Sequence, residues 1–430
     1  MKVIKLKKIL SAAFFGAATA AVVYTISQTM GYRTFLGIQN MVDDSHFIVR
    51  DKPASRPGGI VIIDIDDYSI NHLGNFKHWP RRHFAQVISL ARNGGARIIF
   101  LDVILMEGGK IGDNQALVDS VACAGNVISG YYFNLDYQSR RERPLDPVYN
   151  EKFSDNWFNT QRFEKIEFIR AENITLPFRE MVESSKGLGF TNYIPDPDGI
   201  VRHIPLYISY NRRLLPSAAL QMWLQMKGMH FTNVVISPKG SRFGETFVPT
   251  DKHCFMRLNY SLSGKTYRTI SFASVLKGQY PAEIFKDKVV MIGSSSSILG
   301  DLKKIPGHNA LPGVQIHAAA LSTLLEKNFI TVVPGDVIFG FTILSGILAG
   351  LFFSFLPPVK AGLPMAIAFP MILYAISMYS FSAHARLINI TIPSAVVILL
   401  YIVITIHRTV EYYERKNYKK NPVHCQRPDG

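Results

Sequence analysis

Residues 60–65 read IVIIDI, an uninterrupted run of mainly β-branched residues that ends beside acids. Such a run is typical of a strand buried on both faces of a sheet. A second buried-type strand, RIIFLDVIL, follows at residues 97–105. Between them, residues 81–92 carry apolar side chains at helical spacing: Phe84, Val87, Ile88 and Ala91. Strand, helix and strand in this order predict a βαβ unit with parallel strands.

The rest of the middle region extends this unit. Residues 288–292 (KVVMI) predict a third buried strand, and residues 312–325 predict a helix after it. Residues 187–259 mix turn signals with short alternating runs, which favours antiparallel additions. Residues 136–169 are polar, aromatic and irregular, and we interpret them as an insertion. The predicted fold class is therefore α/β with a mixed, largely parallel sheet.

Both ends of the chain are different in kind, because they hold long apolar segments without charge. Each is about the length needed to cross a hydrocarbon core of ~30 Å, so we predict four transmembrane helices. They are residues 9–31, 337–356, 361–381 and 387–406. The first could instead be a cleaved signal peptide, but its length favours an uncleaved anchor. Either way, residues 32–333 form an exported domain.

The charge distribution predicts the orientation. The net charge is +15, and basic residues concentrate in residues 1–8 and 407–430, which flank the outermost spans. Positive flanks remain on the cytoplasmic side, so we expect both termini in the cytoplasm and the domain outside. This placement, and the lack of an aromatic-interleaved basic stripe, argue against nucleic-acid binding. Cys123 and Cys254 would share an oxidising compartment, where they either pair or remain as buried thiols.

Polar residues gather where the predicted parallel strands end. Ligands of open α/β sheets bind outside the carboxyl ends of the strands, so these side chains are the candidate ligand-binding residues. They are Asp64, Asp66, Asp67, Asp102, Ser294, Ser295 and Asp301.

Two interpretations of these residues stay open. The acids could hold a hard cation through oxygen ligands, or they could cap the following turn. The serine run could form an anion-binding nest, or only a tight turn. We assign no catalytic residue, metal or cofactor, because no nucleophile or paired base accompanies the acids. The turn at residues 196–199 predicts a structural contact between Asp198 and Arg202.

Several strings in this order resemble a known family. They are IVIIDIDDYSINHLG (60–74), WPRRHFAQVISLARNGGARIIFLDVI (79–104), GFTNYIPDPDGIVRHIPL (189–206), LPSAAL (215–220), ISFASVLKG (270–278), KVVMIGSSSSILGDLKKIP (288–306) and LPGVQIHAAALSTLLEKNFI (311–330). Followed by three spans, they resemble the CHASE type-2 family of extracytoplasmic sensor domains in bacterial signalling proteins. The resemblance covers residues 33–406.

The resemblance implies a sensor in the bacterial inner membrane that reads an extracytoplasmic ligand or protein. Family members usually carry a cytoplasmic cyclase or kinase as output, whereas residues 407–430 are too short for one. We therefore expect no enzymatic activity, a homodimer, and a separate cytoplasmic output protein. One alternative is an envelope assembly factor that binds other proteins through its exported domain. Another is an exported hydrolase that uses Asp64, Asp66 and Asp102 with a metal.

Overall fold

The computed structural model describes residues 2–50, 59–135, 158–159, 166–229, 234–261, 266–296, 299 and 302–420. It contains two compact units. The helical unit comprises residues 1–46 and 331–430, and the α/β unit comprises residues 47–330. Residues 32–46, which the sequence analysis assigns to the exported domain, thus pack with the apolar helices.

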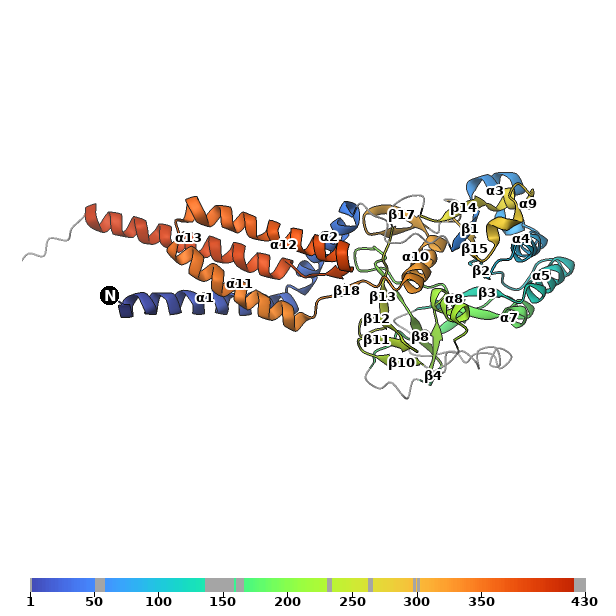
Figure 1. Ribbon diagram of the computed structural model, residues 1–430, viewed down its shortest axis with the longest axis horizontal. Coiled ribbons are helices and arrows are strands. Elements are labelled where there is room, and N and C mark those ends of the chain that lie inside the picture. Colours follow the sequence, from blue (N-terminus) through green and yellow to red (C-terminus); the bar gives the residue numbers. More distant parts are fainter. Residues whose placement is uncertain are drawn as a thin grey trace, which may run out of the picture. The chain divides into compact units, whose positions relative to one another are not determined.

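A seven-stranded sheet forms the centre of the α/β unit (Figure 1). Its strand order is β14-β1-β15-β2-β3-β5, and β6 also pairs with β3. Every pairing in it is parallel except that of β5. The strands are β1 (Ile60–Ile65), β2 (Ile98–Leu101), β3 (Val127–Asn134), β5 (Asn173–Thr175), β6 (Gly187–Phe190), β14 (Arg268–Ser271) and β15 (Val289–Ser294).

This sheet confirms the predicted α/β class and its largely parallel pairing. The two strands of the βαβ unit are parallel but not adjacent, because β15 lies between β1 and β2. The second strand is also shorter than predicted, since it ends at Leu101 and Asp102 already lies beyond it.

Helices cover both faces of the sheet. On one face, α4 (Arg82–Asn93) buries the predicted Phe84, Val87, Ile88 and Ala91 in a core with side chains of β1, β2 and β15. The same core takes residues from α3 (Asp67–Leu73), α5 (Ile111–Ala124), α7 (Arg179–Ser184) and α9 (Phe272–Leu276). Helices α8 (Ala218–Lys227) and α10 (Gly313–Glu326) contact each other, and they contact β6 and β15 respectively. Helix α10 confirms the helix predicted at residues 312–325.

The antiparallel pairing predicted for residues 187–259 is present, but its strands form small separate sheets instead of joining the seven-stranded one. They form β7–β13, β8–β9 and β10–β11–β12 pairings, and β16 and β17 pair further on. The bounds are β4 (Phe158–Asn159), β7 (His203–Pro205), β8 (Tyr207–Tyr210), β9 (Arg213–Pro216), β10 (Val234–Ser237), β11 (Gly240–Phe243), β12 (Thr246–Pro249), β13 (Phe255–Arg257), β16 (Leu302–Ile305) and β17 (His308–Pro312). Most of the predicted insertion at residues 136–169 lies outside the described residues. Cys123 is exposed and Cys254 is buried, and both are free thiols.

The helical unit contains α1 (Lys2–Gln28), α2 (Tyr32–Val49, up to His46), β18 (Thr331–Val332), α11 (Gly335–Phe355), α12 (Leu363–His384), β19 (Arg386–Leu387) and α13 (Thr391–Lys420). Among the described residues, four helices are long and apolar enough to cross a membrane, as predicted. They cover Leu6–Gln28, Gly335–Phe355, Pro358–His384 and Thr391–Lys416. The last helix begins at Thr391, later than the predicted residue 387, because residues 386–387 pair with β18.

Candidate functional site

The carboxyl ends of β1 and β15 bring the predicted acids and serines together. The two strands run in parallel register, with Ile65 opposite Ser294. Asp64 accepts hydrogen bonds from the backbone N–H of Ser295 at 2.8 Å and from the Ser295 hydroxyl. The Ser294 hydroxyl donates to the carbonyl of Ile65 at 2.9 Å. The sheet register therefore links the strand-end acids with the strand-end serines.

The next two acids are also engaged by neighbours. Asp66 is the N-cap of α3, where it accepts from the backbone N–H and the hydroxyl of Ser69 at 2.8 and 2.6 Å. It accepts a third bond from Ser271 at 2.9 Å. Asp67 accepts from the hydroxyl of Ser296. Any ligand at this edge would have to compete with these bonds, so the geometry favours the capping interpretation of Asp66.

The remaining candidates lie beside or beyond this cluster. The backbone N–H of Asp102 donates to the carbonyl of Ile292 at 2.8 Å, which places Asp102 next to the end of β15. Asp301 lies outside the described residues. Among the residues that the structure describes, no three His, Cys, Asp or Glu side chains group closely enough to hold a metal ion. Ligand binding by the seven predicted residues stays a prediction.

Burial raises the pKa of Asp64 above its ordinary value of 3.8. The hydrogen bonds from Ser295 oppose the rise, while the charges of Asp66 and Asp67 add to it. A folded pKa above the unfolded one means that the folded state binds the proton more tightly. The contribution of Asp64 to stability is therefore greatest below pH 3.8 and falls as the pH rises through the folded pKa.

An Asp64→Asn variant tests whether this carboxylate is structural. Asparagine can accept from the Ser295 N–H and donate to its hydroxyl, so we expect no loss of stability at neutral pH. Asp64→Ala leaves the Ser295 donors unpaired, and we expect a loss of about 1–3 kcal/mol. Thermal unfolding followed by tryptophan fluorescence measures both. Equal losses in the two variants would mean that the negative charge itself is required, as a bound cation would require it.

A second polar cluster surrounds Arg202, whose side chain is only 4% exposed. Its guanidinium donates to Asp196 at 2.6 Å and forms a bidentate pair with Asp198 at 3.0 and 2.7 Å. The hydrogen bond from Arg202 lowers the pKa of Asp198. The predicted contact between Asp198 and Arg202 is thus confirmed, and Asp196 joins it.

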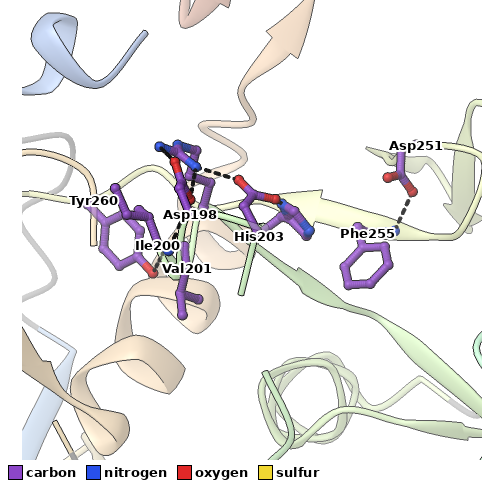
Figure 2. Close-up of polar contacts among 9 residues, drawn as sticks. Asp198, Ile200, Val201, His203, Asp251, Phe255 and Tyr260 are labelled. Atoms are coloured by element: carbon purple, nitrogen blue, oxygen red, sulfur yellow. Dashed lines mark hydrogen bonds and ion pairs between the residues drawn. The ribbon is translucent and has the colours of Figure 1, made fainter. Parts of the chain in front are cut away.

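The surrounding backbone fixes this cluster in place. Figure 2 shows Asp198 next to Ile200 and Val201, where the Ile200 N–H donates to the Asp198 carboxylate at 3.2 Å. The buried hydroxyl of Tyr260 donates to the carbonyl of Val201 at 2.9 Å. The two acids bond to the buried arginine. We therefore interpret the cluster as structural, because it connects the turn at residues 196–199 to the core.

The comparisons with known proteins agree with this architecture. The model of the CHASE2 domain matches residues 17–352, which is most of the chain. The chain therefore belongs to the CHASE2 domain family, and it carries a sensor domain of this type together with four apolar helices long enough to span a membrane. No curated protein and no solved structure matches it.

Sequence reasoning missed one group of functional candidates, which lies in the helical unit. Gln39 of α2 is 6% exposed, and its side-chain oxygen accepts from Ile390 N at 3.1 Å, Thr391 N at 3.3 Å and Thr391 Oγ1 at 2.8 Å. Its side-chain nitrogen donates to Ile388 O at 3.2 Å. Gln39 thus caps α13 from another helix. The available signal was a glutamine soon after a predicted span, but its partner is over 300 positions away in the sequence.

Proposed function

We propose that the chain is a receptor of the bacterial inner membrane that passes the state of an extracytoplasmic ligand to a separate cytoplasmic protein. In this proposal both termini are cytoplasmic, the α/β unit lies outside, and the chain catalyses no reaction itself. Family membership supports the sensing role. The basic flanks of the outermost spans support the orientation.

The observation that carries the proposal is a set of hydrogen bonds to one segment, residues 385–391, which joins α12 to the first residue of α13. We name this segment the clamp loop. The chain leaves the α/β unit through β18, which pairs with β19 in the clamp loop. Thr331 N donates to Ala385 O, and Val333 N donates to Leu387 O, both at 3.0 Å. The incoming connection, α2, bonds to the same loop through Gln39. Both connections are therefore hydrogen-bonded to the loop that starts α13.

This arrangement provides a physical route for a signal. The first backbone N–H groups of a helix have no partner within the helix, and here Gln39 accepts from those of Ile390 and Thr391 at the start of α13. A displacement of α2 or β18 would break or move these bonds and so change how α13 begins. Ligand binding would then favour one of two arrangements of α13 according to its relative affinity for them.

The opposite end of α13 supports an output role. Arg408 donates to the carbonyls of Phe353 and Leu356, where α11 ends. Beyond it, α13 continues to Lys420 and exposes Tyr412 and Tyr413. A single helix therefore connects the clamp loop to an exposed aromatic surface, which we propose as the contact for the cytoplasmic partner. We also propose that two copies associate in parallel, so that the exposed ends of their α13 helices can move relative to each other.

Photocrosslinking in cells tests the proposal. A photoreactive amino acid at Tyr413 is expected to capture a cytoplasmic protein, and Gln39→Leu is expected to change the yield of that product. Gln115→Leu is the matched control, because Gln115 bonds to Asp119 within an exposed face of its own helix. Capture of envelope proteins alone, with a yield indifferent to Gln39→Leu, would instead favour an assembly factor.

A further inference from the structure

Helix α2 has its polar and apolar faces reversed relative to a helix in water. Its buried side chains include Gln39, Asn40 and Asp43, which are at most 7% exposed. Its exposed side chains include Ile38 at 47% and Met41 at 74%. A surface helix in water buries its apolar stripe and exposes its polar one. The exposed face of α2 therefore suits an apolar surrounding.

The polar face is turned toward the helical bundle, where it finds partners. Gln39 bonds to Asp43 at 2.6 Å as well as to the clamp loop. Ser45 forms a hydrogen bond of 2.9 Å with the hydroxyl of Tyr374 on α12. The ring of His46 lies 5.4 Å from that of Tyr374. Polar groups in lipid must be satisfied within the protein, and the side chains of Gln39 and Ser45 meet this requirement. The ring nitrogens of the buried His46 are the exception among the described residues of α2.

These contacts also set the depth of α2. Tyr374 lies ten residues before His384, the last residue of α12. At 1.5 Å per residue this is about 15 Å along the helix. Helix α12 is one of the four apolar helices long enough to cross a membrane. The partner of Ser45 thus lies well inside a spanning helix, not at its end.

The start of α2 is continuous with the first span. Only residues 29–31 separate it from α1, and Gly31 N donates back to Ile26 O at 2.9 Å. Tyr32 and Arg33 are both exposed at the first turn. Tyrosine is enriched at membrane interfaces, and a long basic side chain can reach the headgroups while its stem lies in apolar surroundings.

We propose that α2 lies in the outer leaflet of the membrane, with Ile38 and Met41 in contact with lipid. The lipid surface is favoured over a second copy of the chain because α2 continues from the first span and its opposite face contacts the spanning helix α12. The clamp loop would then have a lipid-facing neighbour. The choice of the outer leaflet rests on the orientation in the proposed function, but the contact of α2 with lipid does not require a receptor, so each can fail separately.

Spin labels in lipid vesicles test the proposal. Two variants of the full chain each carry one new cysteine, Met41→Cys or Ile38→Cys. Both also carry Cys123→Ser and Cys425→Ser. Cys254 remains, because its side chain is buried and this burial raises the pKa of the thiol to about 12. The nitroxide-labelled protein is reconstituted into phosphatidylcholine–phosphatidylglycerol vesicles. Its accessibility to oxygen, which enriches in lipid, is then compared with that to a water-soluble nickel chelate.

We expect labels at Met41 and Ile38 to be more accessible to oxygen than to nickel. A label at Met106 of the α/β unit is the matched control, since this methionine is also exposed, at 57%. It is expected to show the reverse order. Preferential nickel accessibility at both Met41 and Ile38 would overturn the proposal. So would spin–spin broadening between copies at these positions, because the face would then be covered by a second chain.

Discussion

A Gly346→Val variant is expected to unfold the helical unit at a markedly lower temperature than the unchanged protein. A Cβ atom at Gly346 would lie 2.5 Å from the carbonyl oxygen of Gly16 and 2.7 Å from the Cβ of Ala20. One at Gly16 would lie 2.1 Å from the carbonyl oxygen of Gly346. The backbones of α1 and α11 therefore touch, and a side chain at either position forces the helices apart.

The expected loss follows from the kind of contact. Small residues four positions apart allow membrane helices to approach closely, and Ala12, Gly16 and Ala20 face Gly346 and Gly350 in this way. Overpacking usually costs about 1–3 kcal/mol, and we expect the upper end because the obstacle is backbone and cannot rotate away.

Gly340→Val is the matched control on the same helix, since nothing lies within 4 Å of a Cβ at Gly340. Both variants place valine in α11, so the difference between them isolates the contact with α1. Thermal unfolding in detergent, followed by far-UV circular dichroism and size-exclusion elution, measures the difference in stability between the two variants. Indistinguishable unfolding temperatures would contradict the close packing of α1 on α11.

The largest features of the fold could be predicted from local pattern. Four charge-free segments of spanning length indicated the apolar helices, and continuous β-branched runs indicated β1 and β15. Strand order could not be predicted, because no local signal places β15 between β1 and β2. The meeting of Asp64 with Ser295 depends on that order, so the sequence indicated the candidates without their pairing.

Residues 32–46 pack with the apolar helices, and sequence pattern could not have shown this for a physical reason. A surface helix in water buries its apolar stripe and exposes its polar one, and α2 departs from this pattern. In the structure Gln39 and Asp43 are buried and bond to each other, Gln39 also bonds to the clamp loop, and Ile38 is exposed. The cap that Gln39 provides for α13 joins residues far apart in sequence, and periodicity carries no information about such contacts.

The second large effect is expected in the α/β unit, where Arg202→Met should destabilise the fold. The buried guanidinium holds Asp196 and Asp198, and methionine would leave both carboxylates without it. Breaking a buried ion pair costs about 3–5 kcal/mol, and we expect about 3 because Asp198 is partly exposed and can be solvated. Trp79 and Trp223 are buried in the α/β unit, so their fluorescence reports on its unfolding.

The same variant is expected to change the response to acid. Because the bond from Arg202 lowers the folded pKa of Asp198, the stabilisation is present above its ordinary value of 3.8 and is lost as the pH falls toward the folded pKa. The difference in stability between the unchanged protein and Arg202→Met should therefore shrink below pH 3.8. Arg242→Met is the control, since Arg242 is exposed and lies over the ring of Phe247 instead of between carboxylates. A difference that stayed constant with pH would show that Arg202 acts by packing and not through its charge.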